Sequence, residues 1–164
     1  MVKPLKDLRE EIDQLDAEIV RHVVKRLAVV GEIAHTKLVE GREIYDPARE
    51  EALAEKIGAL ARDKAASVQM LYRTMTAVSR AEEHNAYRGG CSTLPAGTYT
   101  VRVKTERGLS DIMLMLVVNN VPPTSFCFSG TELVLSVSCS LPRGFVNDML
   151  EHGFILIGEQ NGGE

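Results

Sequence analysis

The chain has 164 residues, of which 45% are hydrophobic and 26% are charged, as in ordinary globular proteins. A net charge of -4, 5% aromatic residues and the absence of Trp argue against a nucleic acid partner, because such a partner calls for an excess of cations and for rings that stack on bases. The N-terminus lacks the apolar core of a signal peptide, and no run approaches the roughly 18 apolar residues of a membrane span. We therefore expect no membrane partner and a cytoplasmic location.

The cysteines and histidines show no metal-binding pattern. Cys91, Cys127 and Cys139 form no CxxC pair, and we expect the last two to be small buried apolar residues in a reducing compartment. The histidines, which share no ligand spacing, are expected on the surface or on helix faces: His22, His35, His84 and His152. No metal or other cofactor is expected.

The sequence changes character near residue 88. Before this point, charged and apolar residues alternate at helical spacing, and after it come β-branched alternation, paired prolines and glycines. Residues 89–97, GGCSTLPAG, are typical of a linker because Gly, Ser and Pro do not sustain a helix. We expect a helical domain over residues 1–88 and a second domain over residues 98–160.

The helical part begins with one long amphipathic helix, predicted from about residue 5 to residue 38. Its apolar residues step by three or four: Leu5, Leu8, Ile12, Leu15, Ile19, Val23, Leu27, Val30 and Ile33. Such a helix spans about 50 Å, which is too long for the core of so small a monomeric domain. A second copy of the chain is the simplest partner for it. Gly41 is expected to end the helix.

Two shorter helices are expected before the linker. Asp46 is suited to cap the first of these, with Pro47 at the first helical position, and this helix should run to about residue 61. The next helix, from about residue 66 to residue 87, carries one apolar face: Val68, Leu71, Tyr72, Met75 and Val78.

The second part alternates between strand and helix patterns. Strands are predicted at residues 98–104, 123–128, 132–139 and 154–159, and a helix at residues 142–152. The stretch IMLMLVV at residues 112–118 is apolar on all sides and fits a helix and a strand equally well. As a helix, it gives the order β-α-β-β-α-β, which is the small α+β plan called ferredoxin-like.

Charged residues lie on the core faces of the predicted helices or at their edges. Arg26 and Lys37 are eleven residues apart, which returns to nearly the same side of a helix, whereas Arg9 lies well off that side. Arg9 is thus suited to complete the site of a second copy. Other polar residues cluster at helical spacing on the two later helices: Asp46, Arg49 and Glu50 within one turn, and Ser79 and Glu83 four apart. Solvated helix surface and a shared anion site both fit this pattern.

The segments LREEIDQLD, KRLAVVGEIAHTK and GREIYDPAREE resemble the signature of the all-helical chorismate mutases over residues 5–60. The motif consists of an Arg before an I-x-x-[IL]-D run, an Arg in mid-helix, a Lys eleven residues later, and D-x-x-R-E. The resemblance implies a homodimer of intertwined three-helix chains with two sites. It also implies the isomerase reaction from chorismate to prephenate, in the shikimate pathway to Phe and Tyr.

The resemblance further implies roles for individual residues. Arg9 of the partner chain and Arg26 of the same chain would bind substrate carboxylates, while Lys37 would reach the ether oxygen of the breaking bond. Asp46 and Glu50 would bind the region of the ring hydroxyl. The remaining members of the set would line the site: Arg49 close by, Ser79 in contact with substrate, and Glu83 where many members have Gln. The reaction is unimolecular, so positioned charges suffice and no cofactor is implied.

Glu83 departs from the family pattern. A carboxylate beside an ether oxygen that gains negative charge would repel it, whereas a protonated carboxyl would donate a hydrogen bond. We therefore predict that Glu83 must be protonated for full activity and that the rate falls as pH rises, unless burial lifts the pKa of Glu83 toward neutrality. The alternative is that Glu82, or a shifted alignment of the third helix, fills this role.

Residues 98–159 resemble an ACT domain, a small module that binds amino acids and regulates biosynthetic enzymes. The strand TYTVRVK, the turn TERGLSDI and the element order carry this resemblance, although Arg107 replaces the usual Pro. An aromatic amino acid is the implied effector, and the implied site comprises the glycine turn and the loop opposite: Gly108, Leu109, Ser110, Asn119 and Asn120. The alternative is that this domain only supports dimerisation.

Two other functions fit parts of the sequence. One is a pyruvate lyase that acts on isochorismate within the same helical fold, against which Asp46, Glu50 and Lys37 favour the mutase. The other is a non-catalytic subunit that senses amino acids through its second domain and binds a biosynthetic enzyme through its helices. The intact set of polar residues argues against this second function.

Overall fold

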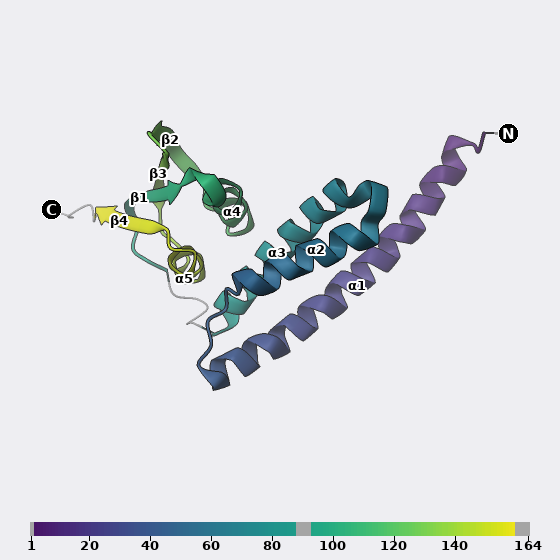
Figure 1. Cartoon of the computed structure of the whole chain (residues 1–164), viewed down its shortest axis with the longest axis horizontal. Helices are drawn as coiled ribbons and strands as arrows, with labels where there is room; N and C mark the ends of the chain where they lie inside the picture. Colours follow the sequence, from purple (N-terminus) through teal and green to yellow (C-terminus); the bar gives the residue numbers. More distant parts are fainter. Residues whose placement is uncertain (1, 88–92, 160–164) are drawn as a thin grey trace.

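The computed structural model describes residues 2–87 and 93–159. The first part folds as helices α1 (Leu5–Glu40), α2 (Pro47–Ala61) and α3 (Ala65–Tyr87), with a short 3-10 turn (Arg62–Lys64) before α3 (Figure 1). The predicted caps are present. Gly41 ends α1 in the left-handed conformation, and the Asp46 carboxylate accepts a hydrogen bond of 2.9 Å from the Arg49 backbone N–H.

Helix α1 is packed along only part of its length. Val30 and Ala34, in its second half, are buried. The apolar stripe of its first half is open to solvent, with exposed fractions between 41% and 63% in a single chain: Leu5, Leu8, Ile12, Leu15 and Ile19. In Figure 1 this end of α1 projects beyond α2 and α3. Among residues 2–87 and 93–159, the long helix thus leaves a large apolar surface without a packing partner.

The second part has the order β1 (Gly97–Lys104), α4 (Thr105–Val118), β2 (Pro123–Ser129), β3 (Glu132–Cys139), α5 (Arg143–Glu151) and β4 (Ile155–Glu159). The strands form one antiparallel sheet in the order β2-β3-β1-β4. The predicted sequence of strands and helices is therefore confirmed. The ambiguous stretch 112–118 is helical, and Ile112 and Met115 on its inner face join Val101, Leu135 and Phe145 in the core.

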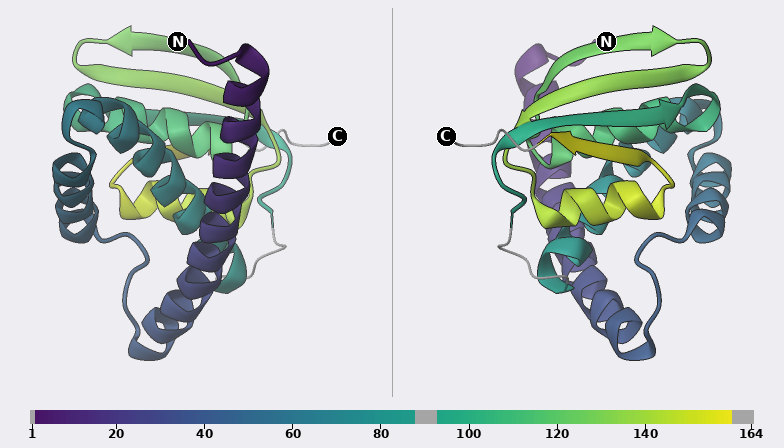
Figure 2. Two further views of the ribbon diagram at one scale, coloured as in Figure 1. Left: turned by 90° about the vertical axis from the view of Figure 1, so that its right-hand side faces the viewer. Right: turned by 90° about the vertical axis from the view of Figure 1, so that its left-hand side faces the viewer.

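Helices α4 and α5 connect the two parts. Both lie on the same side of the sheet and both contact α3, so they are sandwiched between the sheet and the helical domain (Figure 2). Gly144 allows α5 to approach α3 closely, because a Cβ atom there would lie 2.7 Å from Asn85 Oδ1. In the described part of the chain, no helix is both long and apolar enough to cross a membrane.

Some local predictions need correction or qualification. Cys127 is exposed, because it lies on the edge strand β2, whose side chains are all exposed, and Cys139 is half-buried. The expected burial is thus wrong for Cys127, and Cys91 lies outside the described residues. Within the predicted linker, residues 89–92 also lie outside the described residues. The Leu94 N–H, further along, donates a 2.8 Å hydrogen bond to Leu141 O in the second domain.

Candidate active site

Arg26 and Lys37 of α1 both face α3, as their spacing predicts. Arg26 Nη1 donates a hydrogen bond of 2.5 Å to Ser79 Oγ. Lys37 Nζ lies 3.2 Å from Glu83 Oε2 and donates a second hydrogen bond, of 2.5 Å, to the backbone oxygen of Ile44. Two cations of one helix therefore meet the two polar residues that are neighbours on the other, and the four side chains form one cluster.

Ser79 and Glu83 are almost fully enclosed, with exposed fractions of 3% and 7%. Burial raises the pKa of Glu83 above its ordinary value, although the nearby ammonium of Lys37 opposes this shift. Glu82, the alternative considered for the same role, is exposed. The carboxyl group that contacts Lys37 is thus one whose proton is retained to higher pH than in water.

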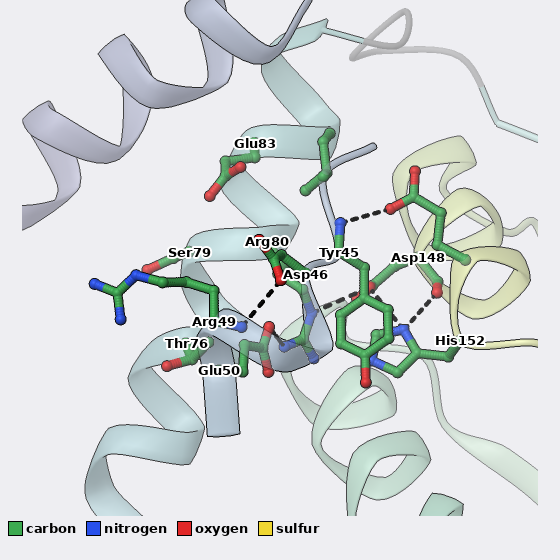
Figure 3. Close-up of polar contacts among 12 residues, drawn as sticks. Tyr45, Asp46, Arg49, Glu50, Thr76, Ser79, Arg80, Glu83, Asp148 and His152 are labelled. Carbon is green, nitrogen blue, oxygen red and sulfur yellow. Dashed lines mark hydrogen bonds and ion pairs between the residues drawn. The ribbon is translucent and has the colours of Figure 1, made fainter. Parts of the chain in front are cut away.

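The start of α2 supplies the remaining predicted residues of the same chain. Glu50 is partly exposed and its Oε1 lies 2.5 Å from Arg80 Nη1, next to Ser79 in the sequence. Asp46 and Arg49 are exposed, and Figure 3 shows the Arg49 guanidinium pointing away from Arg80. The structure therefore pairs Glu50 with the helix that carries Ser79 and Glu83, whereas Asp46 and Arg49 are exposed.

Arg9 does not reach this cluster within one chain. It is exposed on the first part of α1, seventeen residues before Arg26. That separation corresponds to about 25 Å along a helix at 1.5 Å per residue. A second chain is required if Arg9 is to take part in the site.

Sequence reasoning missed a buried polar network behind the cluster. Arg80 Nε donates a 3.1 Å hydrogen bond to Asp148 Oδ1 of α5, and His152 Nδ1 lies 3.3 Å from the same oxygen. The His152 ring stacks on Tyr45 with centroids 3.5 Å apart (Figure 3). His84, expected on the surface or on a helix face, lies on a face of α3 that is buried, with 1% of the residue exposed. It packs between α3 and α5, where its Nε2 lies 3.8 Å from Asp148 Oδ1.

Each charged group in this network favours the ionised form of its neighbours. Burial alone would raise the pKa of Asp148, but the nearby imidazoles of His152 and His84 and the charge of Arg80 outweigh it and hold that pKa well below the usual range. Burial likewise would lower the pKa of Arg80, and the charges of Asp148 and Glu50 reverse the shift. Burial raises the pKa of Tyr45. Arg80 and Asp148 therefore form a buried ion pair.

The predicted effector residues do not share one pocket in the structure. Gly108 lines a cavity of about 420 Å³ at the junction of the two domains, together with Tyr45, Arg102, Lys104, Asp111, Glu132, His152, Gly153, Phe154 and Ile155. A Cβ atom at Gly108 would lie 2.5 Å from Val103 Cγ1, so glycine is required there. Leu109 lines a separate apolar cavity of about 280 Å³, and Ser110 is exposed. Asn119 and Asn120 lie at the other end of α4.

Within the described residues, no group of three or more His, Cys, Asp or Glu side chains is placed to hold a metal ion. The candidate site contains charged and hydrogen-bonding side chains: Arg26, Lys37, Glu50, Ser79 and Glu83. An arrangement of this kind is suited to fix a small anion with several oxygen atoms and to stabilise charge that develops on it.

Comparisons with known proteins concern the helical part of the chain. Residues 8–84 match the family described as chorismate mutase type II. The chain is 43% identical over 54 residues to the T-protein of Haemophilus influenzae, a match that covers 33% of this chain and 14% of that protein. The chain thus spans only a small part of the curated relative, and no solved structure matches it. Residues 8–84, which make up just under half of the chain, are therefore similar to the chorismate mutase type II family.

Proposed function

We propose that the chain acts in the cytoplasm as a chorismate mutase that converts chorismate to prephenate. The observation that carries this proposal is the meeting of Arg26 and Lys37 with Ser79 and Glu83. Two cations that contact neighbouring residues of α3, one of which is a buried carboxyl group, suit a substrate that carries two carboxylates and an ether oxygen. The substrate must be held in its folded conformation, and positioned charges achieve this without a covalent step.

The residues divide this work between binding and stabilisation of charge. Arg26 binds one carboxylate with its planar guanidinium, while Lys37 places an ammonium where the ether oxygen gains negative charge. Protonated Glu83 donates a hydrogen bond to the same oxygen. Glu50, with Asp46 and Arg49 beside it on α2, accepts a hydrogen bond from the ring hydroxyl through Oε2, since Oε1 is paired with Arg80.

A second copy of the chain completes the site. The exposed apolar stripe on the first half of α1 supports a homodimer, because a surface of this size is costly to leave in water. In such a dimer, Arg9 of the partner binds the second carboxylate of the substrate. Each site then contains residues of both chains.

The direct test supplies purified full-length protein with chorismate and, in parallel, with isochorismate, and identifies the products by NMR. The proposal predicts prephenate from chorismate and no release of pyruvate from isochorismate. Pyruvate from isochorismate without prephenate would favour the lyase, and a folded dimer without turnover of either substrate would favour a non-catalytic subunit.

We further propose that the second domain is ACT-like and binds an aromatic amino acid that regulates the mutase. The cavity at Gly108 supports this proposal because it combines Arg102 and Lys104 with Asp111, and aromatic rings of Tyr45 and Phe154. Such a lining suits a carboxylate, an ammonium and a ring on one small molecule. Calorimetric titration with Phe, Tyr and Trp should show binding of one of them, and Asp111→Asn should weaken it. If none of the three binds, the domain has a structural role only.

A further inference from the structure

Arg80 of α3 lies between carboxylates of two domains. Its Nη1 pairs with Glu50 Oε1 of α2 at 2.5 Å, and its Nε pairs with Asp148 Oδ1 of α5 at 3.1 Å. The Arg80 side chain is 6% exposed and that of Asp148 is 2% exposed, whereas that of Glu50 is 30% exposed. Figure 3 shows the three groups in a row, with Arg80 between Asp148 and Glu50, which belongs to the candidate site.

This arrangement restricts where the Glu50 carboxylate can lie. A guanidinium presents its donors in a fixed planar fork, so the position of one bonded carboxylate sets the direction in which the other donors point. Asp148 is itself held by His152, at 3.3 Å from its Oδ1. A buried charge that loses a partner must reorganise to recover one. Loss of Asp148 would therefore allow Arg80 to turn and carry Glu50 with it.

A second contact ties α5 to the site independently. Glu151 Oε2 accepts a 2.8 Å hydrogen bond from the Tyr45 backbone N–H. The preceding residue, Ile44, provides the backbone oxygen that accepts a hydrogen bond from Lys37 Nζ. Helix α5 thus fixes both the segment that orients Lys37 and the guanidinium that orients Glu50.

We propose that Arg80 and Asp148 are positioning residues of the mutase site, and that α5 of the second domain forms part of the framework of that site. Asp148 holds Arg80, and Arg80 holds Glu50 where it meets the substrate. This inference rests on the proposed chorismate mutase activity. It adds that catalysis in the helical domain depends on the Asp148 carboxylate of the other domain.

The test measures kcat and KM for chorismate in full-length Asp148→Asn, in Glu50→Gln and in the double variant. Asp148→Asn keeps the shape of the side chain and removes its charge, and should lower kcat/KM by about 10-fold to 100-fold, as small displacements of positioned groups do. In the Glu50→Gln background the same change should lower kcat/KM by less than about 2-fold, because Glu50 is no longer available to be positioned. A role in folding alone would lower kcat/KM equally in both backgrounds and would overturn the proposal.

Arg80→Lys provides a second test if Asp148→Asn does not fold. Lysine keeps the charge between the two carboxylates but lacks the fork that joins them, so the same loss and the same dependence on Glu50 are expected. Asp63→Asn, at a side chain that is 81% exposed on the turn before α3, is the matched control and should match the wild type. Wild-type kcat/KM in folded Asp148→Asn or Arg80→Lys would overturn the proposal. Failure of the proposed function is distinguishable, because wild-type protein would then not convert chorismate.

Discussion

The site contains a buried carboxyl group, that of Glu83, in contact with the ammonium of Lys37. The 3.2 Å contact joins an ammonium to a carboxyl group whose pKa burial raises above its ordinary value. In the absence of substrate, the Lys37 ammonium donates a hydrogen bond to the Glu83 carboxyl group. Once an ether oxygen lies between them, the protonated form of Glu83 is the one that stabilises growing negative charge.

The pH dependence of turnover follows from this arrangement. The proposed role of Glu83 requires its protonated form, so kcat/KM should be highest below the raised pKa of Glu83 and should fall as pH rises through it. Glu83→Gln, which keeps a donor at every pH, should remove this fall. Steady-state rates measured from about pH 5 to about pH 9 test this, with Glu82→Gln on the exposed neighbour as the control. A Glu83→Gln profile that matches the wild type would refute the role of the proton.

We expect catalysis to depend on the planar guanidinium of Arg26 and not only on its positive charge. Arg26→Lys keeps the charge but loses the planar pair of donors, and should lower kcat/KM by about 100-fold or more. Arg73→Lys, on an exposed position of α3, should have no such effect. If Arg26→Lys were as active as the wild type, Arg26 would not bind a substrate carboxylate.

The contacts of a residue could be predicted from the sequence only where helical periodicity determines them. The contacts of Arg26 and Lys37 with α3 follow from helical periodicity, because the period fixes which side chains share a face. The pair of Arg80 and Asp148 is separated by 68 residues. No local period relates two residues so far apart, and a charged residue in an amphipathic helix is more often solvated than buried.

Among the elements, α1 and α5 carry the main consequences. The exposed stripe of α1 predicts that a charge on it weakens the dimer. Each isoleucine contributes about 1.5–3 kcal/mol when it is buried, so Ile19→Asp should raise the dimer dissociation constant by at least about 10-fold and lower activity at low protein concentration. Arg21→Asp places the same carboxylate on the other side of the helix and serves as the control. Sedimentation equilibrium measures both variants, and an unchanged Ile19→Asp dimer would contradict the proposed interface.

Asp148 of α5 should make the free energy of unfolding of the protein depend on pH in the acid range. Since the pKa of Asp148 is held below its unfolded value of about 3.9, its contribution is fully present above about pH 4 and is lost as pH falls towards the folded pKa. Asp148→Asn should therefore lower the free energy of unfolding at about pH 7 by on the order of 3 kcal/mol. The difference from the wild type should shrink below about pH 4. Urea unfolding across this range measures it, and a difference that does not vary with pH would show that packing, and not charge, is responsible.

The helix α4 illustrates the limit of prediction for elements. Its stretch at residues 112–118 has no polar side to reveal a period, because one face meets the sheet while other residues pack beneath the helical domain or line an apolar cavity. The caps of α1 and α2 were predictable since Gly41 and Asp46 act within one turn of the chain.

At the scale of the whole molecule, the two domains are joined into one unit. The contacts of α4 and α5 with α3 could not be predicted, because each domain shows a complete pattern of its own and surface packing between domains leaves little periodic signal. Their consequence is that the cavity at Gly108 shares Tyr45 and His152 with the network behind the candidate site. A ligand in that cavity would contact Tyr45, which follows the residue that accepts a hydrogen bond from Lys37. It would also contact His152, which lies against Asp148, the partner of Arg80.

The central claim is that the protein is a chorismate mutase whose sites are shared between two chains. The most direct test mixes the Arg9→Ala and Arg26→Ala variants, each inactive alone, after unfolding and joint refolding. Random pairing makes half of the dimers mixed, and each mixed dimer has one intact site of two, so about one quarter of wild-type turnover should return. A mixture that remains as inactive as its parents, or an Arg9→Ala variant that is fully active alone, would contradict the shared site.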